Sequence, residues 1–316
     1  MSTVIATHNL TKRYGGKTAV DRLTLDVPAG SIYALLGDNG AGKSSTIRVL
    51  TGQQPADAGR AEILGQDCWA NAVALRHRVG YVPERPRFYD WMTVTEIGGF
   101  VAGFHKPGFE LRYRDLVENF RLDAAAKLKN LSKGGYAKVG LALALAIDPE
   151  VLILDEPTSG LDLLTRREFL ASMVDLAGEG RTILISSHQI SEVERVASHV
   201  AILAEGKLVV AEPLEDLKKR FVRLRLRHEG APPDPFALGT ILERNGSGRM
   251  MQLVLRDPRP DAIDLLRNAA NVFDVEESSL TLEEIYAGLL TRPVKAKRNG
   301  SVEPEEAAAA SEEERP

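Results

Sequence analysis

The chain has 316 residues, which is enough for one large domain and a smaller one. Its 44% hydrophobic and 27% charged residues are typical of a globular protein with an apolar core, which excludes a low-complexity or fibrous chain. A net charge of −4 gives no overall attraction to nucleic acid, and the single cysteine, Cys68, excludes an internal disulfide bond and agrees with a reducing compartment.

A glycine-rich loop between a strand and a helix predicts a phosphate-binding site. Residues 31–36 form an apolar run typical of a buried strand, and residues 43–50 predict a helix immediately after the loop. The loop follows the pattern G-x-x-x-x-G-K-[ST], with its fixed places held by Gly37, Gly42, Lys43 and Ser44. Because glycine has no side chain, the backbone of such a loop can turn its N–H groups toward a nucleotide β-phosphate at the helix N-terminus.

The side chains that follow the glycines have the chemistry of a nucleotide site. Lys43 supplies a mobile cation for the β- and γ-phosphates, Ser44 a hydroxyl ligand for Mg²⁺, and Ser45 a hydroxyl donor to a neighbouring phosphate. The residues predicted to bind the nucleotide in this loop are Asp38, Asn39, Gly40, Ala41, Gly42, Lys43, Ser44 and Ser45.

Two carboxylates follow a second buried strand. Residues 151–154 are apolar and β-branched, and they end in Asp155 and Glu156. The carboxyl edge of an open α/β sheet is where ligands bind. We expect Asp155 to serve Mg²⁺ and Glu156 to polarise or deprotonate the attacking water. A solvated acidic turn is the alternative interpretation.

A histidine follows a third apolar strand, at residues 182–185. His188 is expected at the same sheet edge, where its neutral imidazole could reach the γ-phosphate or the water. The other five histidines lie in polar or mixed surroundings without metal-ligand spacing, so we interpret them as surface or locally bonded residues.

With these segments in their order, residues 3–220 resemble the ATP-binding subunit of ABC transporters. The matching motifs are the Walker A loop at 37–45, the signature at 131–135, Walker B at 151–156, the D-loop at 159–162 and the switch histidine His188. The resemblance implies ATP and Mg²⁺ as cofactors and places Tyr14 where an aromatic ring stacks on adenine. It also implies an α/β P-loop NTPase core with an antiparallel β subdomain and a helical subdomain.

The same resemblance implies a head-to-tail dimer with a second copy of the chain. In that arrangement Ser132, Gly134 and Gly135, at the start of a helix expected over 135–147, cover ATP held by the partner's Walker A loop. A capped helix start without this role is the alternative, and the segment fits that as well.

Three positions depart from the family pattern. Glu84 replaces the usual Q-loop glutamine, Lys133 replaces the first signature glycine, and Gly135 replaces the signature glutamine. Glu84 could still contact Mg²⁺ or its water. Residues 79–94 are most similar to ABC-2 type exporter subunits, in which glutamate and a lysine-bearing signature also occur.

A transmembrane permease of the ABC-2 type is the second partner that the resemblance implies, docked near residues 84–95. Phe88, Tyr89, Trp91 and Met92 gather in this stretch. They are either an exposed partner surface or a small satellite core under a loop.

Three segments are expected along the chain: an ATPase domain over 1–220, a small α+β accessory domain over 221–293, and a disordered acidic tail over 294–316. In the accessory domain we expect a strand at 221–227, a hairpin over 240–256, and two short helices, the second begun by a capping box at 281–284.

The predicted function is that of an ATP-hydrolysing subunit of an ABC-2 type exporter, peripheral to the cytoplasmic face of the membrane. The longest apolar stretch, 139–147, is shorter than the ~20 residues that span a bilayer, so we expect the permease to be a separate chain. A soluble ABC ATPase acting on ribosomes or DNA is the alternative, although such relatives carry two ATPase halves or a long coiled-coil insert. A GTPase or small-molecule kinase would share only the P-loop. The cargo is not encoded in this chain.

Overall fold

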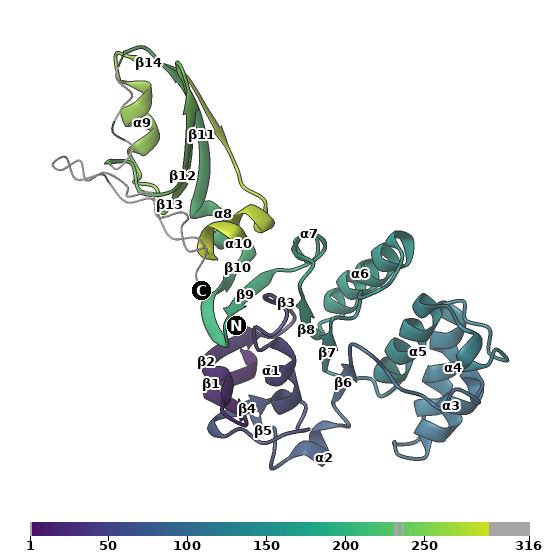
Figure 1. Ribbon diagram of the computed structural model, residues 1–316. Coiled ribbons are helices and arrows are strands. Elements are labelled where there is room, and N and C mark those ends of the chain that lie inside the picture. Colours follow the sequence, from purple (N-terminus) through teal and green to yellow (C-terminus); the bar gives the residue numbers. More distant parts are fainter. Residues whose placement is uncertain (1, 231–233, 235–236, 291–316) are drawn as a thin grey trace, which may run out of the picture. The chain divides into compact units, whose positions relative to one another are not determined.

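A computed structural model describes residues 2–230, 234 and 237–290 (Figure 1). The chain divides into two compact units. The first contains Met1–Val222 together with Ser278–Thr291, and the second contains Arg223–Glu277. The accessory domain was predicted over 221–293; in the structure, residues 278–290 group with the first unit. The predicted tail at 294–316 lies outside the described residues.

A six-stranded sheet forms the centre of the first unit. Its strands, in sheet order, are β10 (Lys207–Pro213), β9 (His199–Ala204), β3 (Ile32–Leu36), β8 (Thr182–Ser187), β7 (Val151–Asp155) and β6 (Val79–Val82). The strands from β9 to β6 are parallel, whereas β10 pairs with β9 in the antiparallel sense. Every residue of β3, β7 and β8 is buried, as expected for parallel strands covered on both faces.

A second, antiparallel sheet carries the N-terminal hairpin. Its order is β2 (Lys17–Pro28), β1 (Thr3–Tyr14), β4 (Ala58–Ile63) and β5 (Gln66–Asp67). One apolar core joins this sheet, the central sheet and α1 (Lys43–Leu50), through residues such as Leu10, Val20, Ile47, Ile153 and Leu184. The other helices of this region are α2 (Ala72–Leu75) and α6 (Leu163–Gly178).

Three helices form a separate group with its own apolar core. They are α3 (Val94–Ala102), α4 (Phe109–Asn119) and α5 (Lys133–Ala146), and the short 3₁₀ turn η1 (Leu128–Asn130) precedes α5. A capping box between Thr93 and Glu96 starts α3, and Ser132 caps α5. Because of that cap, α5 begins at Lys133, two residues before the predicted start. The antiparallel sheet, the parallel core and this helical group confirm the predicted architecture (Figure 1).

Three further helices complete the first unit: α7 (Ile190–Val193), α8 (Leu214–Lys219) and α10 (Leu282–Leu290). The predicted capping box at the start of α10 is present, with the Glu284 N–H donating to Thr281 Oγ1 at 3.3 Å and the Thr281 N–H donating to Glu284 Oε2 at 2.9 Å. No helix among the described residues is both long enough and apolar enough to cross a membrane.

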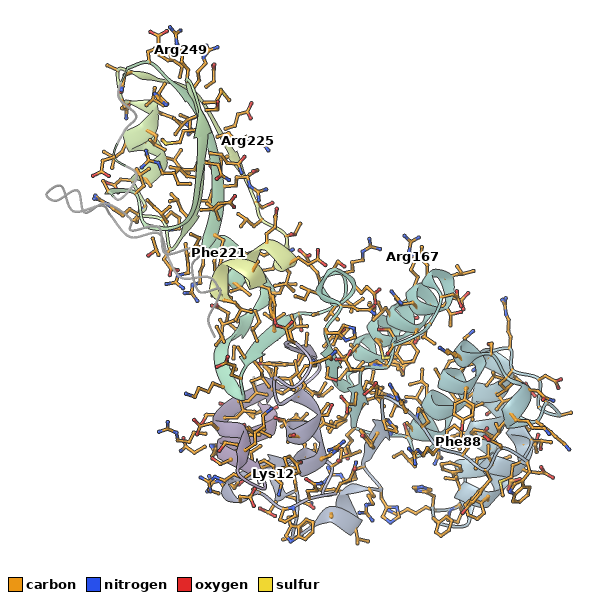
Figure 2. All side chains as sticks on the ribbon, viewed as in Figure 1. Lys12, Phe88, Arg167, Phe221, Arg225 and Arg249 are labelled. Carbon is orange, nitrogen blue, oxygen red and sulfur yellow. The ribbon has the colours of Figure 1, made fainter. Side chains whose placement is uncertain are left out.

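The second unit is a four-stranded sheet with one helix. Its strand order is β12 (Thr240–Ser247), β13 (Met250–Arg256), β11 (Phe221–His228) and β14 (Val272–Ser278), and its helix is α9 (Ala262–Arg267). Leu224 and Leu226 of β11 are buried, while Arg225 between them is exposed (Figure 2). The predicted hairpin is present, with Ser247 paired to Met250 across the turn.

Candidate functional site

The three strands that carry the predicted site residues are neighbours in the central sheet. The order β3, β8, β7 places the glycine-rich loop, His188 and the Asp155–Glu156 pair at one carboxyl edge. In the strand register Leu36 lies opposite Ser187, and Asp155 lies opposite Ser186. Segments that are more than 100 residues apart in sequence therefore meet at one site because the strands are parallel.

The loop between β3 and α1 requires glycine at two positions for steric reasons. A Cβ atom on Gly37 would lie 2.5 Å from the Leu203 carbonyl oxygen, and one on Gly42 would lie 2.6 Å from the Ala19 carbonyl oxygen. Gly42 also has a φ of 108°, in a region that L-residues rarely adopt. Helix α1 starts here without a side-chain cap, so its first N–H groups remain available to a phosphate.

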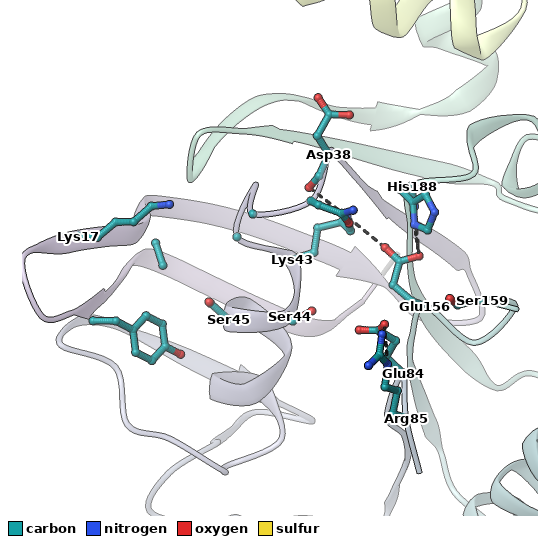
Figure 3. Close-up of a pocket in the computed structure, with 15 residues that line it drawn as sticks. Lys17, Asp38, Lys43, Ser44, Ser45, Glu84, Arg85, Glu156, Ser159 and His188 are labelled. Carbon is teal, nitrogen blue, oxygen red and sulfur yellow. Dashed lines mark hydrogen bonds and ion pairs between the residues drawn. The ribbon is translucent and has the colours of Figure 1, made fainter.

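A pocket of about 530 Å³ opens at this edge of the sheet (Figure 3). Eleven of the predicted site residues line it: Tyr14, Asp38, Asn39, Gly40, Gly42, Lys43, Ser44, Ser45, Glu84, Glu156 and His188. Ala41 instead lines an adjacent cavity, and Asp155 is buried beneath the pocket. The volume is within the range of small-molecule sites.

Lys43, Glu156 and His188 are joined in a line across the pocket (Figure 3). Lys43 Nζ lies 3.1 Å from Glu156 Oε1, and His188 Nδ1 lies 2.7 Å from Glu156 Oε2. Lys43 Nζ also donates to the Gly37 carbonyl oxygen at 2.6 Å. Lys43 and Glu156 are both buried, so each charge depends on the other for compensation.

The bond between His188 and Glu156 determines which imidazole nitrogen faces a ligand. An ionised carboxylate can only accept, so the proton of a neutral ring must lie on Nδ1. Nε2 is then left as an acceptor. A neutral His188 in this tautomer can accept a hydrogen bond from water, and it can donate to a phosphate oxygen only after it gains a second proton.

The backbone at Glu156 is strained and is held by its neighbour strand. Glu156 has a φ of 49°, which is uncommon for a residue other than glycine. Its N–H donates to both the carbonyl oxygen and the hydroxyl of Ser186, at 3.2 and 3.0 Å. The Ser186 hydroxyl in turn donates to Asp155 Oδ1 at 2.7 Å. Ser186 therefore holds the Asp155 carboxylate and the strained backbone that carries Glu156.

The predicted Mg²⁺ ligands supply suitable oxygen atoms. Ser44 Oγ donates to Asp155 Oδ1 at 3.2 Å, which brings a hydroxyl and a carboxylate together at the start of α1. Glu84 lines the same pocket, and its Oε1 lies 3.4 Å from Arg85 Nε. Hydroxyl and carboxylate oxygens are the donors that Mg²⁺ prefers, so these residues fit that ion.

The signature residues lie outside this pocket. Ser132 Oγ accepts from the Gly135 N–H at 3.1 Å, which is the cap of α5. Gly134 faces α6, and a Cβ atom there would lie 2.8 Å from Thr165 Cγ2. None of Ser132, Gly134 and Gly135 is among the residues that line the pocket of the same copy.

Two other predicted residues differ in how they face the pocket. Tyr14 is at its rim, at the end of β1, and its hydroxyl donates to Gln54 Oε1 at 2.5 Å. The Asp38 side chain points away from Lys43 and the phosphate cradle, although its carbonyl oxygen accepts from Lys43 Nζ at 3.3 Å (Figure 3).

The aromatic stretch after Glu84 is divided between core and surface. Met92 is buried in the core of the helical group, and Phe88 packs against that core with its ring centroid 4.9 Å from that of Tyr136 (Figure 2). The core alternative therefore holds for Phe88 and Met92. Tyr89 and Trp91 are exposed, and their role as a partner surface stays a prediction.

Sequence reasoning missed several residues of the site. Ser186 was not predicted as a site residue, although its place opposite Asp155 follows from the pairing of β7 with β8. Lys17 and Arg85 also line the pocket and add positive charge. No sequence motif marks these two cations, because they reach the pocket from the β1–β2 turn and the loop after β6.

Comparisons with known proteins agree with this geometry. The ABC transporter family matches residues 20–159. The bacitracin transport ATP-binding protein BcrA of Bacillus licheniformis is 40% identical over 224 residues, which cover 70% of this chain and 73% of BcrA. The daunorubicin/doxorubicin resistance ATP-binding protein DrrA of Streptomyces peucetius is 30% identical over 306 residues, 92% of this chain and 93% of DrrA. A solved ATP-binding subunit of an ABC transporter has a TM-score of 0.63 at 29% identity, covering 69% of this chain and 92% of that one.

Proposed function

This chain belongs to the ATP-binding subunits of ABC transporters, and we propose that it works as a head-to-tail pair of copies driving an ABC-2 type export permease. ATP hydrolysis is the activity of the family. The pairing, the permease and the roles of individual residues are the proposed parts. The match to DrrA extends over both units of the chain, which supports an exporter rather than a soluble ABC ATPase.

The observation that carries the proposal is the division of the site between two surfaces. Lys43, Glu156 and His188 meet in one pocket, whereas the capped start of α5 at Ser132 is elsewhere on the same copy. The N-terminus of a 14-residue helix attracts an anion through its N–H groups and dipole. A second copy would bring this helix start to the first copy's triphosphate.

The pocket residues suit in-line attack by water on a γ-phosphate. Lys43 compensates phosphate charge, and it must exchange its bond to Glu156 for the phosphates as a nucleotide binds. Glu156 then becomes free to accept the proton of the attacking water, with His188 Nε2 able to accept a second hydrogen bond from it. Mg²⁺, held by Ser44 with Asp155 behind it, would neutralise charge on the phosphates.

An exposed aromatic cluster supports the proposed permease contact. It consists of Tyr89, Trp91, Phe100 and Phe104, whose neighbouring rings lie 5.5 to 5.9 Å apart. Trp91 is 64% exposed and Phe104 is 67% exposed. Exposed aromatic side chains of this kind are enriched in protein interfaces. The cluster joins the loop after Glu84 to α3, so a bound partner would contact the segment that follows a pocket residue.

Glu156→Gln tests the catalytic assignment. The amide cannot accept the proton, so the turnover rate should fall by about 10²- to 10⁴-fold while ATP still binds. With ATP and Mg²⁺, light scattering should show this variant as a dimer. Unchanged turnover in Glu156→Gln would contradict the role of this residue.

A second substitution in the Glu156→Gln variant tests the proposed pairing. Ser132→Arg should abolish the dimer and leave ATP binding by the monomer unchanged, because Ser132 does not line its own pocket. Glu118→Arg, at an exposed position of α4, is the matched control and should still dimerise. Weaker ATP binding by the monomer that carries Ser132→Arg would contradict the assignment across two copies.

The permease contact is tested by co-purification from detergent-solubilised host membranes. Trp91→Ser with Phe104→Ser should lose an ABC-2 permease that the unchanged chain retains, with equal basal ATPase activity in both chains. Leu111→Ser is a matched control, since Leu111 is also an exposed apolar residue of the helical group. Equal recovery of the permease with all three chains would refute this surface.

A further inference from the structure

The C-terminal end of the described chain lies beside the nucleotide loop. After the second unit, the chain returns to the first unit and forms α10, where Leu282 and Ile285 are fully buried. Helix α10 contacts α7, which begins two residues after His188. It is therefore attached to an element that directly follows a predicted catalytic residue.

One polar side chain of α10 faces the glycine-rich loop. The Tyr286 hydroxyl oxygen is shielded from solvent and makes no well-formed hydrogen bond with the described residues, although Asp38 lies close enough to act on it. Burial and the nearby Asp38 carboxylate raise the pKa of Tyr286 to about 12, so the phenol keeps its proton at neutral pH and remains a donor. A buried hydroxyl without a partner is costly, and Asp38 is the acceptor whose charge acts on it.

The orientation of Asp38 also favours a contact between the glycine-rich loop and α10. Its carboxylate points away from the phosphate cradle, on the side where α10 lies (Figure 3). Leu289 and Leu290 of α10 line a cavity of about 810 Å³, and Asp38, Asn39 and Gly40 of the loop line the same cavity. The cavity leaves space between the loop and part of α10.

We propose that α10 is a strap on the nucleotide loop, and that Tyr286 is a positioning residue of the ATPase. When the loop closes on a nucleotide, the Tyr286 hydroxyl donates to the Asp38 carboxylate and holds the loop and α10 together. Binding free energies are reciprocal, so a nucleotide that favours this bond is itself bound more tightly by the same factor. The device rests on the proposed nucleotide site and is independent of the permease.

The test uses the full-length Glu156→Gln chain, in which bound ATP persists. Adding Tyr286→Phe removes one oxygen atom and keeps the ring, and it should weaken Mg-ATP binding about tenfold in calorimetry, the loss expected for a hydrogen bond to a charged acceptor. Hydrogen exchange of the amides of residues 282–290 should slow on ATP addition in the parent chain and not in Tyr286→Phe. Glu283→Gln, exposed on the same helix, is the control and should behave as the parent.

A double-mutant cycle separates the bond from general packing. Asp38→Ala and Tyr286→Phe should each weaken ATP binding, and together they should weaken it no more than either does alone. Additive losses, or a Tyr286→Phe chain with unchanged affinity, would overturn the strap. If the parent chain fails to bind Mg-ATP, the nucleotide site itself is wrong and the strap is overturned with it.

Discussion

Replacing Ser186 by alanine removes the hydroxyl that holds the Asp155 carboxylate and the backbone of Glu156. Ser186 is completely buried, and its hydroxyl donates to Asp155 Oδ1 at 2.7 Å while it accepts from the Glu156 N–H at 3.0 Å. The Glu156 N–H keeps a second acceptor, the Ser186 carbonyl oxygen. Most of the destabilisation should therefore come from the lost bond to Asp155.

The expected magnitude follows from the charge on the acceptor. A hydrogen bond to a charged group contributes about 1.5–3 kcal/mol to stability, against about 0.5–1.5 kcal/mol for a neutral pair. Ser187→Ala is the matched control, because Ser187 is also buried and, within the part of the chain that the structure describes, its hydroxyl accepts only from the neutral Gln189 N–H, at 2.9 Å. Ser186→Ala should therefore lose about 1 kcal/mol more than Ser187→Ala. Displaced carboxylates should also lower the turnover rate by about 10- to 100-fold.

Urea unfolding followed by tryptophan fluorescence measures the loss of stability. The two tryptophans, Trp69 and Trp91, are both in the first unit, so their signal reports the unit that contains the site. Steady-state ATPase assays of the same two variants measure the loss of turnover. Equal unfolding free energies and equal turnover in Ser186→Ala and Ser187→Ala would refute the positioning role of Ser186.

Three further results are expected. Gly42→Ala should abolish ATP binding in calorimetry with unchanged circular dichroism, because its Cβ atom would meet the Ala19 carbonyl oxygen at 2.6 Å. Glu84→Gln keeps an oxygen ligand but removes a charge from the pocket, so its ATPase activity should need a several-fold higher Mg²⁺ concentration. Hydrogen bonds from the Thr165 N–H and hydroxyl hold the pKa of Asp162 in the folded chain below its ordinary value of 3.8. The stabilisation of α6 by this cap is therefore complete above pH 3.8, and it is lost as the pH falls through the lower pKa of the folded chain. The unfolding midpoint of Asp162→Asn should therefore differ from that of the parent near neutral pH and approach it in acid.

The parts of the site that the sequence predicts are those with a local signature. The glycine pattern before Lys43 and the carboxylates after an apolar strand are contiguous motifs, and parallel pairing then brings them together. The sequence does not predict the role of Ser186, because Ser186 meets Asp155 only through the register of β7 and β8, which 26 residues separate in sequence.

Two other features required the tertiary structure. Helix α10 is visible in the sequence through its capping box, but the unit in which it packs is decided by long-range contacts of Leu282 and Ile285. The exposure of Phe100 is not apparent from the sequence either, because α3 is apolar around most of its surface and the pattern does not show which side is covered.

Residues 278–290 belong to the first unit, so the described part of the second unit lies in the sequence between two segments of the ATPase body. Truncation after Val222 would remove the second unit, and it would also remove α10 and expose the apolar surface of the first unit that this helix covers. Excision, with a short flexible linker joining Val222 to Ser278, would remove the second unit and retain the helix. A chimaera that receives this unit from another transporter would therefore need two junctions, one near Val222 and one near Ser278.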